Sequence, residues 1–280
     1  MPLTDREQRA LQVIEEWEKT LMNVEATDLQ VTFEKYLEQS FSLLPEQIQS
    51  QFFSLMDTWL FHLNGIIQGS QLQTEAKKRI LSLARTIGTA DIEAIQDLRK
   101  LDLEQVQYIA DKEAAKHKAY SLIQGGLTGT GHALMLGADI PAMAVINLKV
   151  VQLIAMSYGV DTSIPFEMMT SLKVFHTATL PRRLQKQGWQ ALMDERKNGE
   201  HSYFYEGNEE ITDISWLEQP VKQMVKAITI ILFRKKQIQG IPLLGMTVGA
   251  AVNYQLTKNV TEFAANYYQL RYLKAKEELA

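Results

Sequence analysis

The sequence predicts an all-α protein: a multi-helix bundle with two glycine-rich apolar helices packed at its centre. Apolar residues recur at steps of three and four along most of the chain, which is the period of an α-helix, and alternating strand patterns are nearly missing. Capping residues and prolines divide the chain into segments of helical length. We divide the chain into an N-terminal helical region, residues 1–84, and a larger helical domain, residues 85–280.

The N-terminal half predicts five helices from their start signals. Thr4 and Glu7 form a capping box that begins the first helix, which ends near Asn23. Pro45 suits the first turn of a second helix. Two short helices follow at 73–86 and 90–100, separated at Gly88, with Thr89 as the N-cap of the second and Asp102 opening a longer helix. The charged start of the chain carries no export signal, so we expect a cytoplasmic protein.

Proline also marks helix starts in the C-terminal half. Asp139-Ile140-Pro141 predicts an N-cap and the start of a helix over 140–158, which ends at Tyr158-Gly159. Ser163-Ile164-Pro165 predicts a helix over 164–180, and Pro181 begins another segment. Residues 198–213 mix Gly, Asn, acidic and aromatic residues without a helical period, and this predicts a long exposed loop.

Two runs of the chain carry no formal charge, at 119–138 and 237–257. Each is long enough to cross a bilayer, but their glutamines, glycines, His132 and Asn253 favour helices buried in protein. Small residues in these runs recur at steps of four, which would place each set on one stripe of a helix and allow the two helices to pack closely. The predicted packing residues are Gly125, Gly129, Ala133 and Gly137 in the first run and Gly245 and Gly249 in the second.

The composition excludes several kinds of chemistry. The formal net charge of −4 offers no field that would attract nucleic acid, and the chain has no cysteine for disulfides or thiolate sites. The common phosphate-loop, nucleophile-elbow and zinc-protease motifs are missing, so we assign no catalytic residue, no metal and no cofactor. Glu113 and His117 have the spacing of a metal pair, but the lysines around them favour a solvated, salt-bridged helix face.

Four polar residues in apolar surroundings are candidates for a polar pocket: His132, Asp139, Lys149 and Asn253. The alternative is that His132 is a hydrogen-bonded core residue and Asp139 a helix cap. Lys149 either pairs with Glu262 in the interior or extends to the surface. The last helix also carries Asn259, Glu262 and Asn266 on one face, where they could line a polar groove.

Each uncharged run has a cationic segment before it. These segments predict contact with anionic lipid headgroups, because each cation near such a surface contributes about 1 kcal/mol. The alternative is that they are ordinary solvated turns. The candidate lipid-contacting residues are Lys116 and Lys118 before the first run and Arg234, Lys235 and Lys236 before the second.

Residues 125–161 contain a glycine-rich segment, an Asp-Ile-Pro helix start and a Tyr-Gly helix end. Residues 240–260 contain Ile-Pro-x-x-Gly and an Asn-bearing helix. These two segments of the chain resemble the bacterial EcsC family. The resemblance covers roughly residues 85–275. Members of that family are encoded beside an ATP-binding-cassette (ABC) exporter in Gram-positive bacteria, which implies an association with export and a membrane transporter as partner, and does not imply a mechanism.

Two functions therefore fit the sequence. The first is a non-catalytic helical accessory protein, peripheral to the inner face of the cytoplasmic membrane and associated with an ABC-type export system. The second is a soluble helical enzyme, or a protein that binds a small ligand or a lipid, with a pocket lined by the glycine-rich helices.

Overall fold

The described part of the chain consists of helices and the turns between them, and no strand occurs in it. The structure, a computed structural model, describes residues 3–23, 65, 67, 69, 71–128, 133–180, 182–199 and 242–278. The all-α prediction is confirmed. The helix predicted after Pro45, the cationic segment 234–236 and all but the first two residues of the loop predicted at 198–213 lie outside the described residues.

Helix α1 (Asp5–Met22) begins and ends where the capping signals predict. The Thr4 hydroxyl accepts from the Glu7 backbone N–H at 3.3 Å, and a Glu7 carboxylate oxygen accepts from the Thr4 backbone N–H at 2.9 Å. Asn23 is the C-cap, and its backbone N–H donates to the Lys19 carbonyl. The predicted capping box is therefore confirmed.

The next three elements are α4 (Gln71–Ile87), the 3₁₀ helix η1 (Ile95–Lys100) and α5 (Leu103–Thr128). The prediction of a helix from residue 90 capped by Thr89 is wrong. The helix begins five residues later, at Ile95, where the Asp97 carboxylate accepts from the N–H of the N-cap Ala94 at 2.8 Å and from the preceding Glu93 N–H at 3.0 Å. The prediction that α5 opens at Asp102 is confirmed.

Helix α6 (Ala133–Ser157) overturns the predicted start at Asp139. Asp139 and Pro141 lie inside this helix and do not begin it. Proline in a helix interior removes one hydrogen bond and costs about 3 kcal/mol, but packing of α6 between neighbouring helices can outweigh a local preference. The predicted end is confirmed: Gly159 has φ +78°, and the Val160 N–H donates to the Ala155 carbonyl at 3.0 Å.

Three further helices complete the described chain: α7 (Pro165–Thr179), α8 (Arg182–Gly199) and α10 (Pro242–Glu278). Pro165 is the first residue of α7, as the sequence predicts, because its missing N–H needs no partner there. Helix α10 has 37 residues and is therefore about 55 Å long.

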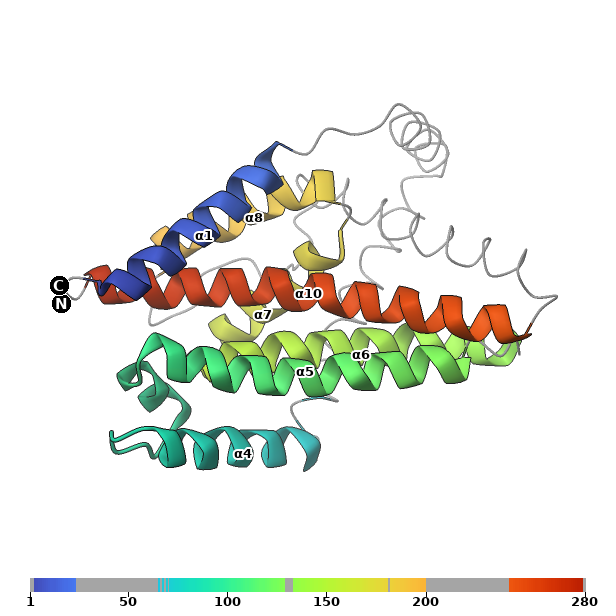
Figure 1. Ribbon diagram of the computed structural model, residues 1–280, viewed down its shortest axis with the longest axis horizontal. Coiled ribbons are helices and arrows are strands. Elements are labelled where there is room, and N and C mark those ends of the chain that lie inside the picture. Colours follow the sequence, from blue (N-terminus) through green and yellow to red (C-terminus); the bar gives the residue numbers. More distant parts are fainter. Residues whose placement is uncertain are drawn as a thin grey trace.

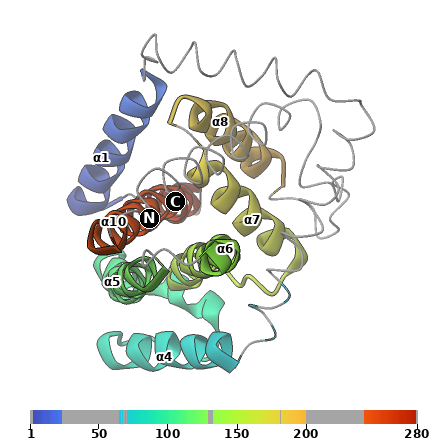
Figure 2. The same ribbon diagram turned by 90° about the vertical axis from the view of Figure 1, so that its right-hand side faces the viewer.

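The helices stack in layers, as the end-on view of Figure 2 shows. Helix α4 covers the pair α5 and α6, α10 and α7 form the next layer, and α1 and α8 cover α10 and α7 on the far side. Helix α10 packs most extensively against α5, and the two run antiparallel through the length of the bundle (Figure 1). Helices α1 and α4, from the predicted N-terminal region, thus pack directly on helices of the predicted larger domain.

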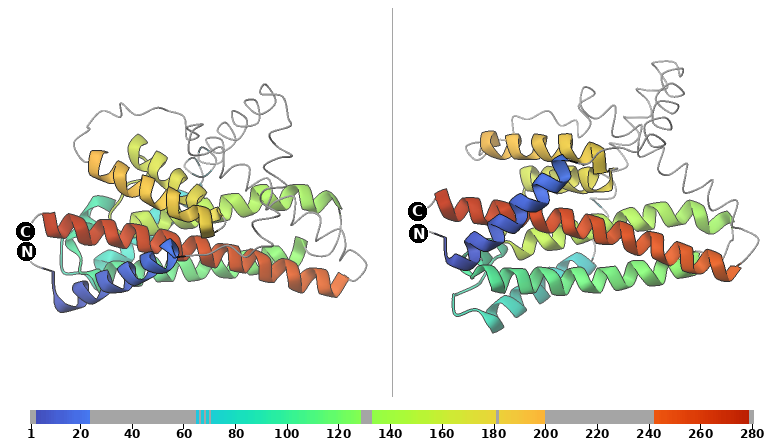
Figure 3. Two further views of the ribbon diagram at one scale, coloured as in Figure 1. Left: turned by 90° about the horizontal axis from the view of Figure 1, so that it is seen from above. Right: turned by 45° about the horizontal axis from the view of Figure 1, so that its top comes forward.

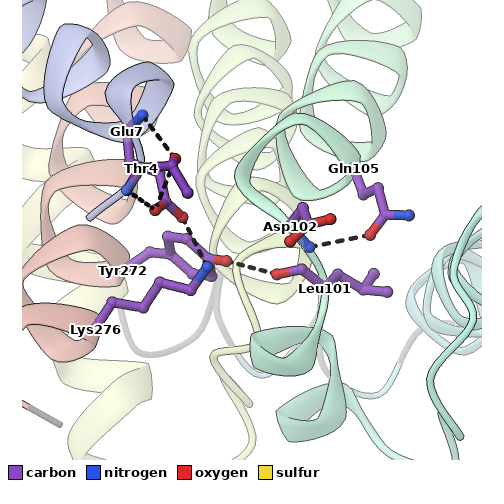
Figure 4. Close-up of polar contacts among 7 residues, drawn as sticks. All are labelled: Thr4, Glu7, Leu101, Asp102, Gln105, Tyr272 and Lys276. Carbon is purple, nitrogen blue, oxygen red and sulfur yellow. Dashed lines mark hydrogen bonds and ion pairs between the residues drawn. The ribbon is translucent and has the colours of Figure 1, made fainter. Parts of the chain in front are cut away.

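Polar contacts fix the two ends of the chain to the middle layers (Figure 4). Lys276 near the end of α10 donates to Glu7 of α1 at 2.7 Å, and the Tyr272 hydroxyl donates to the Leu101 carbonyl at 2.6 Å. Burial acts to raise the pKa of Glu7, but hydrogen bonds from Lys276 and Thr4 outweigh it and leave this pKa below its ordinary value. Glu7 therefore stays charged in the folded protein at neutral pH.

Candidate functional site

The glycine-stepped residues of the first uncharged run do not lie on one helix. Helix α5 ends at Thr128 and α6 begins at Ala133, and the two helices run antiparallel beside each other (Figure 1). Gly125 therefore belongs to α5, whereas Ala133 and Gly137 belong to α6, and the predicted single stripe of four is wrong. Gly129 and His132 lie outside the described residues.

In the second run, Gly245 and Gly249 lie one turn apart near the start of α10, as predicted. The side chains that surround these small residues are outside the described part of the structure, so their role in close helix packing stays a prediction.

The antiparallel arrangement brings both uncharged runs to one end of the bundle. We call this the uncharged end: residues 119–128 of α5, 133–138 of α6 and 242–257 of α10. Figures 1 and 3 show these three helix ends together, at the right of Figure 1, where they extend beyond the other described helices. At 1.5 Å per residue, the uncharged part of α5 is about 15 Å long and that of α10 about 24 Å.

Exposed apolar and cationic side chains form one face of α5 that leads into this end. We call it the tyrosine–lysine face: Tyr108, Lys112, Lys116, Tyr120 and Ile123. At 100° per residue these five lie within an arc of about 120°. The exposed fractions of the three apolar members, Tyr108, Tyr120 and Ile123, are 53%, 47% and 61%. Single exposed apolar residues are ordinary, but three on one arc beside two lysines make a continuous amphipathic surface.

The two lysines of the face pack over its tyrosines. The Lys112 amine lies 5.9 Å from the centre of the Tyr108 ring, and the Lys116 amine lies 5.9 Å from the centre of the Tyr120 ring. Lys118 is half-buried and two residues from Lys116, so it points about 200° away around the helix. Lys116 and Lys118 therefore project from opposite sides of α5, and the predicted lipid contact of the two lysines stays a prediction.

Tyr254 of α10 lies at the same level as Tyr120. The Tyr272–Leu101 hydrogen bond aligns the two antiparallel helices. Tyr254 is 18 residues from Tyr272, about 27 Å along α10, and Tyr120 is 19 residues from Leu101, about 28 Å in the direction of α5. Because Tyr254 is 36% exposed, a second helix adds an exposed tyrosine at the border of the uncharged end.

Beside the tyrosine–lysine face, on the side of α5 that α4 covers, lies a polar cluster between α4, α5 and α6. Arg79 of α4 donates to both carboxylate oxygens of Glu113, at 3.3 and 3.0 Å, and His117 Nδ1 lies 2.9 Å from the Glu113 carbonyl oxygen. Glu113 and His117 are 7% and 4% exposed, so the predicted solvated face is wrong, although the predicted salt bridge is present. Helix α4 covers these residues, which periodicity within α5 alone does not reveal.

Lys149 of α6 is half-buried near this cluster and forms no ion pair with Glu262. That carboxylate instead accepts a hydrogen bond from Trp17 at 3.0 Å, so the first of the two alternatives for Lys149, a buried pair with Glu262, is wrong. Burial lowers the pKa of Lys149, and the positive charge of Arg79 acts in the same direction. Burial likewise lowers the pKa of His117, and Lys149 lowers it further.

The predicted polar pocket of His132, Asp139, Lys149 and Asn253 is described only in part. Asn253 is 6% exposed on α10 and Lys149 is half-buried on α6, whereas the side chains of the other two lie outside the described residues. The pocket stays a prediction. In the described part of the chain, no cluster of acidic and histidine side chains has the arrangement of a metal site, and no helix has the length and hydropathy of a membrane span.

Sequence reasoning found Lys116 but missed the other members of the tyrosine–lysine face. The signal was present, because Tyr108, Lys112, Lys116 and Tyr120 follow one another at steps of four. Spacing alone does not distinguish a buried stripe from an exposed one. The exposed fractions decide it, and they depend on which side of α5 faces α6 and α10.

Comparison with known proteins gives one family and two relatives. The sequence profile of the EcsC protein family matches residues 8–273. The uncharacterized protein YdbA of Bacillus subtilis (strain 168) is 27% identical over 266 residues, which covers 93% of this chain and 90% of the relative. Protein EcsC of the same organism is 24% identical over 203 residues, which covers 72% of this chain and 78% of the relative. No solved structure matches.

Proposed function

Since the chain belongs to the EcsC protein family, we propose that it is a non-catalytic helical accessory protein, peripheral to the inner face of the cytoplasmic membrane and associated with an ABC-type export system. One observation supports the membrane part of the proposal. Two uncharged runs, far apart in sequence, lie together at one end of the bundle beside exposed tyrosines and lysines. Tyrosines and lysines of this kind suit the border between lipid headgroups and acyl chains.

The dimensions of the uncharged end favour shallow contact with one leaflet. The hydrocarbon core of a bilayer is about 30 Å thick, so one leaflet measures roughly 15 Å, which is the length of the uncharged part of α5. In this arrangement Ile123 enters the acyl region, Tyr120 lies at headgroup level, and Lys112 and Lys116 extend from the next turns of α5 toward anionic phosphates.

The energies are sufficient for reversible binding. Full burial of an isoleucine side chain contributes about 1.5–3 kcal/mol, so Ile123, with 61% of its surface exposed, contributes roughly 1–2 kcal/mol. Each lysine near an anionic surface contributes about 1 kcal/mol more. Together these three side chains supply about 3–4 kcal/mol, before any contribution from Tyr120 or Tyr254.

The association with an exporter rests on the family. The resemblance in residues 125–161 and 240–260 implies a place beside an ABC exporter, and one relative is protein EcsC. An exporter of this class has a membrane-embedded part, so a surface that holds the chain at the membrane would also hold it close to that partner.

The proposal is tested by co-sedimentation of the protein with vesicles of phosphatidylcholine alone and with added phosphatidylglycerol. We expect binding to the anionic vesicles that weakens as salt rises from low to physiological concentration, because screening shortens the Debye length to about 8 Å. The double variant Lys112→Gln/Lys116→Gln should lose roughly tenfold in binding or more.

A matched control is Lys19→Gln/Lys186→Gln, which removes two exposed lysines from α1 and α8 on the other side of the bundle. It should bind as the wild type does. Equal losses in both double variants would show that net charge, rather than the tyrosine–lysine face, determines binding. Absence of wild-type binding to either kind of vesicle would refute the membrane part of the proposal.

A further inference from the structure

A small pocket lies between α1, α8 and α10, away from the uncharged end. Its volume is about 120 Å³, and its walls combine two aromatic side chains with several polar ones. Asn259 and Glu262, two of the three residues that the sequence places on a polar face of the last helix, are part of it. The lining residues are Trp17, Thr20, Leu21, Gln185, Asn259, Glu262 and Phe263.

The free polar atoms of this pocket are mostly hydrogen-bond acceptors. Both amide hydrogens of Gln185 are used, because its Nε2 donates to the carbonyls of Ala178 and Leu180 at 3.1 and 2.8 Å, and its Oε1 has no partner among the described residues. The hydroxyl of Thr20 donates to the Glu16 carbonyl and keeps its oxygen lone pairs. Gln185 is 7% exposed, so this free acceptor belongs to a buried wall of the pocket.

Glu262 adds a negative charge to these acceptors. One carboxylate oxygen accepts from Trp17 Nε1 at 3.0 Å, and within the described residues the carboxylate has no cationic partner. The Asn259 Oδ1 accepts a hydrogen bond from Gln255, and its amide N–H remains available as a hydrogen-bond donor in the pocket. The pocket therefore offers one carboxylate, two neutral acceptors and one donor.

The aromatic walls are held rigidly. The rings of Trp17 and Phe263 meet edge to face with centres 5.7 Å apart, and both pack against the fully buried Trp189 at 5.0 and 5.4 Å. Aromatic rings attract cations through their negative faces. A carboxylate, neutral acceptors and aromatic walls in one pocket match a cation that carries N–H donors.

We propose that this pocket binds a primary alkylammonium group. Such a group has three donors and no acceptor, which complements Glu262, Gln185 and Thr20, while its alkyl part contacts Leu21 and the aromatic walls. The volume admits only a short chain. A free amine and the headgroup of phosphatidylethanolamine share this chemistry, and a soluble probe and a lipid probe distinguish them.

The soluble arm of the test is isothermal titration calorimetry of the full chain with n-propylammonium chloride at pH 7.5. We expect saturable binding with a dissociation constant between about 40 µM and 10 mM, because the four non-hydrogen atoms of this cation set the tight limit. Tetramethylammonium has no N–H donor and should bind at least tenfold more weakly. Equal binding of both cations would overturn the proposed role of the acceptors.

The decisive variant is Glu262→Gln, which keeps an oxygen acceptor for Trp17 and removes the charge. Because a hydrogen bond to a charged group contributes about 1.5–3 kcal/mol, we expect a loss of about ten- to hundredfold in amine affinity. Glu15→Gln, which removes an exposed carboxylate from α1 outside the pocket, is the matched control and should bind normally. Thr20→Phe fills the pocket from an exposed position and should also abolish binding.

The lipid arm measures binding to phosphatidylcholine vesicles with and without phosphatidylethanolamine. Binding that needs phosphatidylethanolamine and Glu262, with no response to propylammonium, assigns the site to the lipid headgroup. A response to propylammonium that Glu262→Gln removes assigns it to a free amine. If neither probe gives a Glu262-dependent signal while the variants melt as the wild type does, the proposal is wrong.

Discussion

The buried ion pair between Glu167 of α7 and Arg271 of α10 gives a prediction whose size follows from its geometry. The two terminal guanidinium nitrogens, Nη1 and Nη2, each donate to one carboxylate oxygen at 2.5 Å, and the side chains of Glu167 and Arg271 are only 10% and 14% exposed. Glu167→Gln keeps the shape but leaves the Arg271 charge buried without a counter-ion. Removing one partner of a buried pair costs about 3–5 kcal/mol, a large share of a typical stability of 5–15 kcal/mol.

The assay is urea unfolding followed by circular dichroism, with thermal melting as a second readout. We expect a loss of about 3–5 kcal/mol and a fall in melting temperature of roughly 6–15 °C. Glu277→Gln breaks the exposed pair with Lys274 on the same helix and should cost less than about 1 kcal/mol. Similar losses in both variants would refute the reasoning that burial of the Glu167–Arg271 pair makes it important.

Three further predictions concern packing, pH and charge. Gly188→Ala should destabilise the fold by about 1–3 kcal/mol in the same urea assay, because an added Cβ would lie 2.5 Å from Thr177 Cγ2. In the control Gly65→Ala, an added Cβ would have no atom within 4 Å, so this variant should be as stable as the wild type. Burial lowers the pKa of His176 to about 4, so the unfolded chain binds a proton at higher pH than the folded one. The free energy of unfolding should therefore fall by about 2 kcal/mol from pH 7 to pH 5. His176→Leu should make this dependence on pH shallower, and an unchanged dependence would contradict the role of His176. The second cationic segment consists of Arg234, Lys235 and Lys236. Changing all three to glutamine should weaken binding to anionic vesicles by about 2–3 kcal/mol and leave the melting temperature unchanged. Unaltered binding would exclude that segment from lipid contact.

Sequence reasoning succeeded where a helix boundary is set by neighbours along the chain. The capping box at Thr4, the proline at the start of α7 and the glycine after α6 each act on backbone groups within a few residues. These helix ends can therefore be predicted from the sequence without knowledge of the fold. It failed at Pro141, because there the packing of α6 against α5 and α10 outweighs the local cost of a proline.

The candidate site was predicted less completely because it depends on how helices meet. The cationic residue Lys116 was found, but the burial of His117 one position later depends on Arg79 and α4, which cover that side of α5. The glycine run was interpreted as one helix, although Gly125 and Ala133 lie on separate antiparallel helices. The small residues keep their spacing of four on both sides of the turn between α5 and α6, so periodicity alone cannot show that the chain reverses there.

The most direct test of membrane contact uses the absence of cysteine from the chain. A single Ile123→Cys variant, labelled with an environment-sensitive fluorophore, reports on the tyrosine–lysine face, and Val13→Cys on α1 is its matched control, since the two positions are 61% and 63% exposed. On addition of anionic vesicles, the emission of the label at residue 123 should shift to the blue and become protected from an aqueous quencher, while the label at residue 13 should not change. No shift at residue 123, or equal shifts at both positions, would contradict the proposed contact.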